Sequence, residues 1–105
     1  MIFIETPIFT KEVCGLLPDD EYRALQFALV LRPGQGTIVP GSGGLRKLRW
    51  GVSGKGKRGG IRVIYYWDKT RESIYMLLTY PKHKQEDLTP SQLRVLGRLV
   101  REEFK

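Results

Sequence analysis

Apolar and polar residues alternate over three stretches between positions 45 and 80, namely residues 45–52, 61–67 and 73–80. Alternation with a period of two is typical of β-strands, because successive side chains point to opposite faces. In the middle stretch, one face carries Ile61, Val63, Tyr65 and Trp67, and the other carries Arg62, Ile64 and Tyr66. In the first stretch, Leu48, Trp50 and Val52 share one face, and Lys47 and Arg49 share the other. Short polar segments join the strands, so we expect an antiparallel meander.

The pattern before these strands predicts a long helix over residues 18–31. Pro18 suits a helical first turn, and the acidic residues after it, at positions 19–21, favour the positive end of the helix dipole. Phe27, Val30 and Leu31 widen the apolar stripe towards the end of the helix. We therefore expect this helix to be substantially buried.

Weaker patterns predict the other elements of the N-terminal half. Residues 2–5 are predicted to form a strand that pairs with a later one, because Thr6 and a following proline end the run. Residues 9–17 have apolar positions at roughly helical spacing, which indicates a helical turn. Residues 34–44 are rich in glycine and are expected to form a loop.

The C-terminal residues predict an amphipathic helix. Thr89 is placed to cap it, with Gln92 reaching back in a capping box. Apolar residues follow at spacings of three and four: Leu93, Leu96, Val100 and Phe104. The arginines on its other side are expected to form a solvated face rather than a binding face: Arg94, Arg98 and Arg101.

The charge of the chain is strongly positive and unevenly distributed. The 105 residues include 18 Lys+Arg and 11 Asp+Glu, which gives a net charge of +7. Residues 22–67 contain no acidic residue. The basic residues of that window are Arg23, Arg32, Arg46, Lys47, Arg49, Lys55, Lys57, Arg58 and Arg62. This distribution favours a polyanionic partner such as nucleic acid, and the alternative is a soluble protein with basic faces.

Cysteine and histidine usage limits the chemistry that the chain can perform. One cysteine, Cys14, excludes an internal disulfide, and one histidine is too few for a zinc site of Cys and His ligands. We expect Cys14 to be packed in its apolar surroundings, and we expect no metal or other cofactor. The first residues lack a basic leader and a long apolar run, so we expect a cytoplasmic protein that does not enter a membrane.

Residues 51–60 join a glycine-rich cationic loop to the strand that carries Arg62. Lys55, Lys57 and Arg58 have two interpretations: a solvated hairpin loop, or a flexible segment that closes on an RNA or DNA backbone. The loop approaches the phosphate-binding pattern G-x-x-x-x-G-K-[ST], but Arg58 replaces the hydroxyl residue and a strand follows it, so nucleotide hydrolysis is excluded. Arg62 is on a strand, which positions a guanidinium better than a loop does.

A second cationic cluster follows the strand that ends at Tyr80. Lys82, His83 and Lys84 come directly after Pro81. These residues are either incidental charges of a loop or a site of proton transfer, because the unperturbed pKa of histidine lies close to neutrality.

The order of these segments resembles that of a known group of proteins. A helix is followed by G-x-G-G-L-R-K-L-R, then by G-K-G-K-R-G-G-I-R-V-I-Y-Y, and then by a strand that ends in Y-P-K. Over residues 2–100 the chain resembles the RelE/HigB superfamily of bacterial type II toxins, particularly its HigB-like branch. The resemblance implies a single α+β domain over residues 1–105, with a small antiparallel sheet of about four strands that is mixed at the N-terminal strand. It also implies N-terminal helices packed on one face and a C-terminal helix.

The resemblance implies a ribosome-dependent endoribonuclease, an mRNA interferase that cuts messenger RNA in the A site without a metal ion and so inhibits translation. In this reaction the 2′-OH attacks the adjacent phosphate and leaves a cyclic phosphate and a 5′-hydroxyl end. Arg62 then matches the arginine that stabilises the phosphate charge. The other catalytic candidates are Lys55, Lys57 as base, Lys82 and His83 as acid. The candidates for RNA binding are Lys47, Arg49, Arg58 and Tyr80.

The resemblance also implies partners and leaves two alternatives open. The partners are the ribosome, messenger RNA and a cognate antitoxin, expected to be a helix-turn-helix protein whose complex with the toxin binds operator DNA. The first alternative is a ParE-like toxin of the same fold, which poisons DNA gyrase and has no nuclease activity. The second is a non-catalytic module that binds RNA or DNA.

Overall fold

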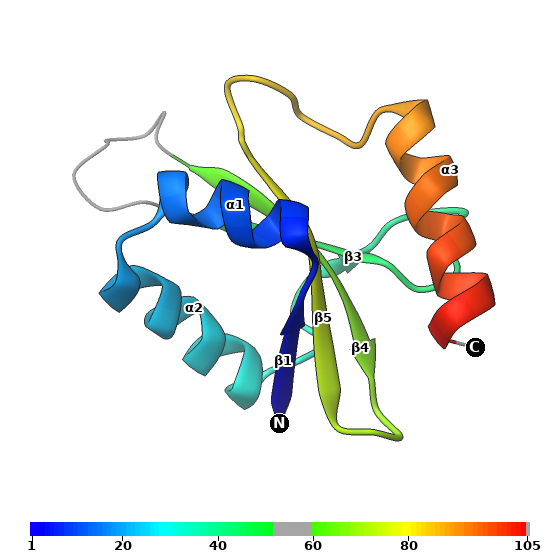
Figure 1. Ribbon diagram of the computed structural model, residues 1–105, viewed down its shortest axis with the longest axis horizontal. Helices are drawn as coiled ribbons and strands as arrows, with labels where there is room; N and C mark the ends of the chain where they lie inside the picture. Colours follow the sequence, from blue (N-terminus) through cyan, green and yellow to red (C-terminus); the bar gives the residue numbers. More distant parts are fainter. Residues whose placement is uncertain (52–59, 105) are drawn as a thin grey trace.

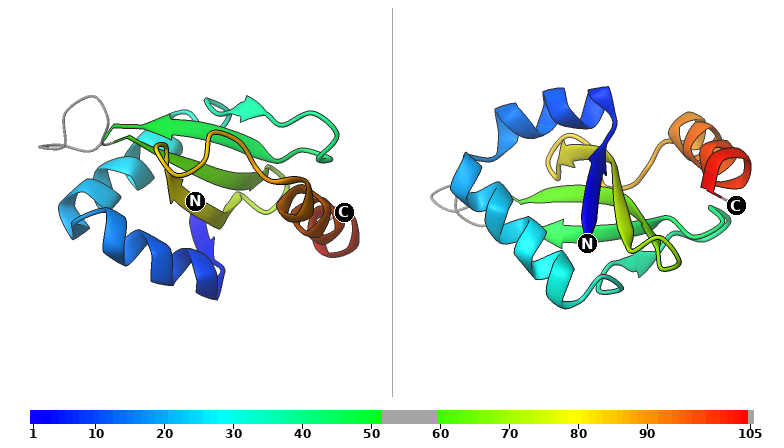
Figure 2. Two further views of the ribbon diagram at one scale, coloured as in Figure 1. Left: turned by 90° about the horizontal axis from the view of Figure 1, so that it is seen from above. Right: turned by 60° about the horizontal axis from the view of Figure 1, so that its bottom comes forward.

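The computed structural model describes residues 1–51 and 60–104 of the chain. Its helices are α1 (Pro7–Leu16), α2 (Asp19–Leu31) and α3 (Pro90–Leu99), and α3 continues into a π-helical turn, η2 (Val100–Phe104). The strands are β1 (Ile2–Glu5), β2 (Thr37–Ile38), β3 (Arg46–Trp50), β4 (Ile61–Asp68) and β5 (Ser73–Pro81). In Figure 1, α1 and α2 lie on one side of the strands and α3 lies on the other. Two further views show the same separation (Figure 2).

The five strands form one mixed sheet in the order β1-β5-β4-β3-β2. The meander of β3, β4 and β5 is antiparallel, which confirms the prediction from alternation. Strand β1 is parallel to β5, so the N-terminal strand does pair with a later one. Strand β2 lies in the segment that the sequence predicts as a loop. A strand of two residues is too short to show alternation, so the sequence does not indicate it. The α+β fold class is confirmed, with five strands instead of about four.

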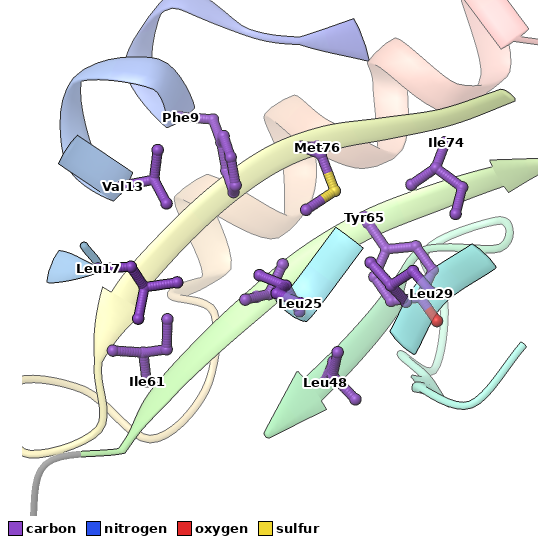
Figure 3. Packing of buried hydrophobic residues seen from close by; sticks show 11 residues of the cluster. Phe9, Val13, Leu17, Leu25, Leu29, Leu48, Ile61, Tyr65, Ile74 and Met76 are labelled. Carbon is purple, nitrogen blue, oxygen red and sulfur yellow. The ribbon is translucent and has the colours of Figure 1, made fainter. Parts of the chain in front are cut away.

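Helices α1 and α2 bury one face of the sheet. Phe9 and Val13 from α1 and Leu25 and Leu29 from α2 point towards the strands (Figure 3). The strand residues of this core are Leu48, Ile61, Val63, Tyr65, Ile74 and Met76. They come in part from the faces that the sequence predicts as apolar in residues 45–52 and 61–67. The face assignment made from the sequence is therefore confirmed, except for Val52, which lies outside the described residues.

Helix α3 covers part of the opposite face. Its residues Leu96 and Leu99 pack against a second core of buried residues, namely Leu45, Ile64, Leu77, Leu78, Tyr80 and Val100. The predicted capping box starts the helix: the Thr89 side chain accepts a hydrogen bond from the Gln92 amide, and the Gln92 side chain accepts one from the Thr89 amide. The chain thus has a core on each side of the sheet.

Hydrogen bonds fix the turn from β1 into α1. The Thr6 hydroxyl accepts a 3.1 Å hydrogen bond from the amide of Phe9, which caps α1. The same hydroxyl donates a 2.9 Å hydrogen bond to the backbone carbonyl of Leu77 on β5. The Tyr22 hydroxyl on α2 donates to the Glu5 carboxylate at the end of β1. These contacts lock the first two helices onto the parallel edge of the sheet.

Two predictions about burial in these helices are wrong. Helix α2 is buried only at Leu25 and Leu29, whereas Phe27 is 64% exposed and Leu31 is 65% exposed. A helix lying on a sheet buries one stripe, and these two apolar residues lie away from that stripe. Cys14 is also exposed, because it lies on the outer side of α1 next to the buried Val13.

Candidate nucleic-acid interface

The sheet register brings four predicted site residues to one face. Arg49 on β3 is paired with Arg62 on β4, and Arg62 is paired with Tyr80 on β5. Directly opposed residues of antiparallel strands project to the same side, with Cβ atoms about 5 Å apart. Lys47 lies on this side two residues before Arg49, a separation of about 7 Å along a strand. We refer to Lys47, Arg49, Arg62 and Tyr80 as the cationic row.

Arg62 is the buried cation of the row. Arg62 is 5% exposed, and its Nη1 donates a 3.5 Å hydrogen bond to the backbone carbonyl of Ile61. The ion pairs found among residues 1–51 and 60–104 are Lys47–Asp87, Arg71–Asp68 and Arg98–Glu102, so Arg62 forms no direct ion pair with a described carboxylate. A buried charge without an opposite charge is unfavourable. The position therefore favours binding of an anion such as a phosphate group.

Tyr80 adds a hydrogen-bond donor beside this guanidinium. The residue is 6% exposed, and its buried hydroxyl has no hydrogen-bond partner among residues 1–51 and 60–104. Burial raises the pKa of the Tyr80 hydroxyl, Asp87 adds to the increase, and Arg62 opposes it. The phenol therefore keeps its proton at neutral pH. Buried polar groups are normally paired, so an unpaired hydroxyl next to Arg62 is consistent with a ligand-binding position.

Sequence reasoning missed an acidic residue in this site. The Lys47 ammonium donates a hydrogen bond to the carboxylate of Asp87, which lies 40 residues further along the chain. That hydrogen bond and the charge of Lys47 lower the pKa of the Asp87 carboxyl, and the charges of Arg62 and Arg49 lower it further. Only the fold places this acid next to the cationic window, and nothing in the local sequence around Asp87 indicates it.

The second cationic cluster lies at the same end of β4 as Arg62. The amide of Lys82 donates a 3.0 Å hydrogen bond to the carbonyl of Gly60, which is the residue before β4. Lys82, His83 and Lys84 are all exposed. The structure thus brings the chain around Lys82 and His83 to the end of the strand that carries Arg62. Three other predicted site residues, Lys55, Lys57 and Arg58, lie outside the described residues.

The described side chains of the site are suited to binding phosphate. Cations and a neutral phenol supply hydrogen-bond donors and positive charge, which are the groups that bind nucleic-acid backbones. In the two described ranges, no group of three or more His, Cys, Asp or Glu residues is placed to hold a metal ion. No helix in the same ranges has the length and hydropathy needed to cross a membrane.

Comparison with known proteins supports the fold. None of the known protein-family models matches the chain. The structure is similar to that of the E. coli toxin RelE, determined in the free state for a mutant in which two arginines are replaced by alanine. The two chains superpose with a TM-score of 0.57 and 15% sequence identity, over 81% of this chain and 86% of that chain. The chain therefore has a RelE-like α+β fold.

Proposed function

We propose that this protein is the toxin of a type II toxin–antitoxin system and a ribosome-dependent endoribonuclease that cuts messenger RNA in the A site. The observation that carries the proposal is the buried guanidinium of Arg62, which has no acidic partner among the described residues and lies in a row of cations on a RelE-like sheet. The sequence of residues 43–66 favours the HigB-like branch of these toxins.

The proposed reaction is a phosphoryl transfer within the RNA chain. A 2′-hydroxyl oxygen attacks the adjacent phosphorus, and its proton passes to a base. The bond from phosphorus to the 5′-oxygen of the next nucleotide breaks, and that oxygen takes a proton from an acid. The products are a 2′,3′-cyclic phosphate and a 5′-hydroxyl end. No metal is needed if fixed cations stabilise the negative charge that develops on the phosphorane.

The roles of the site residues follow from their positions. Arg62 stabilises the phosphorane, because a fixed and desolvated guanidinium interacts strongly with a developing anion. The Tyr80 hydroxyl donates a hydrogen bond to a phosphate oxygen of the same group. Lys47 and Arg49 bind the backbone of neighbouring nucleotides.

Acid and base are proposed from the two cationic clusters of the sequence, of which the loop cluster lies outside the described residues. We propose Lys57 as the base, supported by Lys55, because a dense cluster of cations lowers the pKa of a lysine. His83 is the proposed acid, with Lys82 beside it. Arg58 adds a contact to the RNA backbone.

The proposal includes partners that act on the same surface. A cognate antitoxin of the helix-turn-helix class would neutralise the toxin, and the complex of the two proteins would bind operator DNA. An acidic segment of such an antitoxin complements the cationic row. The protein would act in the cytoplasm, where ribosomes and messenger RNA are found.

Controlled expression in bacteria tests the proposed function. Expression of the wild-type chain is expected to arrest growth and to produce new 5′-hydroxyl ends within the coding regions of translated messages. An Arg62→Ala variant at equal abundance should produce neither effect. Replication arrest with DNA damage and intact messages would indicate a gyrase poison instead. Binding to nucleic acid without any cleavage would indicate a binding module.

A further inference from the structure

A groove of about 400 Å³ opens next to Lys47 on the face of the cationic row. It lies between the segment that contains β2 and the residues that lead into α3. Its walls are largely apolar and include Val39, Pro40, Leu88 and Leu93. Concave sites with apolar walls and a few polar groups are typical of ligand-binding sites.

The groove is continuous with the cationic row. Thr37 on β2 is paired with Lys47 on β3, so both side chains project to the same face, and both line the groove. Lys47 lies two residues before Arg49 in the row. An RNA strand whose phosphates contact Arg49 and Lys47 would therefore lie next to the mouth of the groove.

Leu93 is available to a ligand because of its position in α3. In the apolar stripe of this helix, Leu96 and Val100 pack into the second core. Leu93, three residues before Leu96, lines the groove. The sequence pattern places all of these residues in one apolar stripe, and in the structure Leu93 lines an open groove.

We propose that this groove is a nucleobase-binding subsite that takes one unstacked base of the bound RNA. This inference rests on the proposed function, because it assumes that the ligand of the cationic row is RNA. A base has apolar faces and polar edges. The apolar walls match the faces, and single-stranded RNA is recognised through bases that leave the stack and bind between side chains.

The polar groups at the rim match the edge of a base. Asp87 and Thr37 line the groove together with Lys47. The Asp87 carboxylate accepts hydrogen bonds, for example from an exocyclic amino group, and the Thr37 hydroxyl both donates and accepts. The ion pair between Lys47 and Asp87 fixes both side chains at the junction of the groove and the row. Phosphate would then bind on one side of this pair and a base on the other.

An abasic scan tests the subsite. The probe is a short single-stranded 2′-O-methyl RNA, which cannot be cut, together with variants that lack one base at a time but keep every phosphate. For the wild-type protein, loss of one particular base is expected to weaken binding about tenfold. In Leu93→Ala the intact RNA should bind more weakly, and most of the sensitivity to that abasic position should disappear.

Val95→Ala is the matched control, because Val95 lies two residues further along α3 and is 65% exposed. It should keep both the affinity and the abasic sensitivity of the wild type. Thermal unfolding shows whether Leu93→Ala is folded. If Leu93→Ala is not folded, the abasic scan is repeated with Thr37→Val, which removes only a hydroxyl at the rim.

Three outcomes would overturn the inference, and they show whether the proposed function falls with it. If the wild type binds the RNA but no abasic position matters more than another, the groove takes no base, and the proposed function stands. Unchanged abasic sensitivity in folded Leu93→Ala and Thr37→Val leads to the same conclusion. If the wild type neither binds the RNA nor cuts messages on ribosomes, both the subsite and the proposed function are wrong.

Discussion

Arg62 on β4 lies directly opposite Tyr80 on β5, and this pair buries a guanidinium beside a hydroxyl that has no hydrogen-bond partner in the described part of the chain. Two polar groups placed in this way contribute little to the stability of the folded chain, because burial removes their hydration and the described residues return only one long hydrogen bond, from Arg62 to the carbonyl of Ile61. They do provide two fixed donors for one anion. Removal of these groups should therefore maintain or raise the stability of the fold and lower the activity.

Tyr80→Phe removes only the unpaired hydroxyl. We expect the free energy of unfolding to stay the same or to rise by about 1 kcal/mol, because a buried group without a partner is lost. Cleavage of messenger RNA should nevertheless slow by about tenfold, as expected for the loss of one hydrogen bond to a charged group. Urea unfolding and ribosome-dependent cleavage measure the two effects.

Tyr65→Phe is the matched control for that substitution. The Tyr65 hydroxyl donates a 2.6 Å hydrogen bond to the carbonyl of Pro33 and accepts a 3.0 Å hydrogen bond from the amide of Gly36. Its loss should lower the free energy of unfolding by about 1–3 kcal/mol. If both variants lost stability equally, the Tyr80 hydroxyl would have a structural partner, and its assigned role would be wrong.

Asp87→Asn should tighten the binding of single-stranded RNA by about two- to fivefold at moderate salt, since Lys47 becomes free to contact phosphate. The slope of the logarithm of the binding constant against the logarithm of the salt concentration should become more negative by about 0.7, as expected for one additional phosphate contact. Glu86→Gln removes the same charge from the neighbouring residue and tests for a general electrostatic effect. Equal tightening by both variants would contradict a specific role of the Lys47–Asp87 pair.

The pH dependence of this pair follows from the same geometry. Lys47 lowers the pKa of the Asp87 carboxyl, so the pair is fully present above the ordinary carboxyl pKa and is lost as the pH falls through the lowered value. The difference in RNA affinity between the wild type and Asp87→Asn should therefore be constant from about pH 5 to about pH 8. Fluorescence anisotropy across this range checks it. A difference that changes near neutral pH would implicate another group.

Gly36→Ala should destabilise the packing beneath the sheet. A Cβ at Gly36 would lie 2.9 Å from the Tyr65 ring and 3.2 Å from the Cβ of Arg46, so the side chains must move. We expect a loss of about 1–3 kcal/mol in the free energy of unfolding. Gly15→Ala in α1 meets no atom within 4 Å and should instead raise it by about 0.5–1 kcal/mol. Thermal unfolding of the two variants compares them directly.

Much of the sheet could be predicted from the sequence because side chains of β3 and β4 alternate between its two faces. In β4, Arg62 and Ile64 project to one face while Val63 and Tyr65 project to the other, so the burial of one face fixes the register. The same register places Arg49, Arg62 and Tyr80 together. The positions of Arg49 and Arg62 therefore follow from alternation, but that of Tyr80 does not, because a register shift between β4 and β5 places Leu78 and Tyr80 in the second core while Ile74 and Met76 lie in the first. The roles of these residues in RNA cleavage remain predictions.

The parts of the site that depend on tertiary contacts could not be predicted. Asp87 reaches Lys47 from a segment 40 residues away, and no periodic signal indicates such a contact. The groove is built from residues 37–40 and 87–93, which have no common sequence pattern. The exposure of Phe27 could not be predicted either. Apolar residues lie on more than one side of this helix, and the sequence does not show which side faces the sheet.

The most direct test of the central claim is ribosome-dependent cleavage by purified Arg62→Met and wild-type protein on one defined messenger RNA. Arg62→Met should fold at least as stably as the wild type, because an uncompensated buried charge is replaced by an apolar side chain of similar length. The account predicts that cleavage in the A site by the wild type leaves 5′-hydroxyl ends and that this cleavage falls by a factor of at least about 100 in Arg62→Met. Cleavage at the wild-type rate by folded Arg62→Met would contradict it.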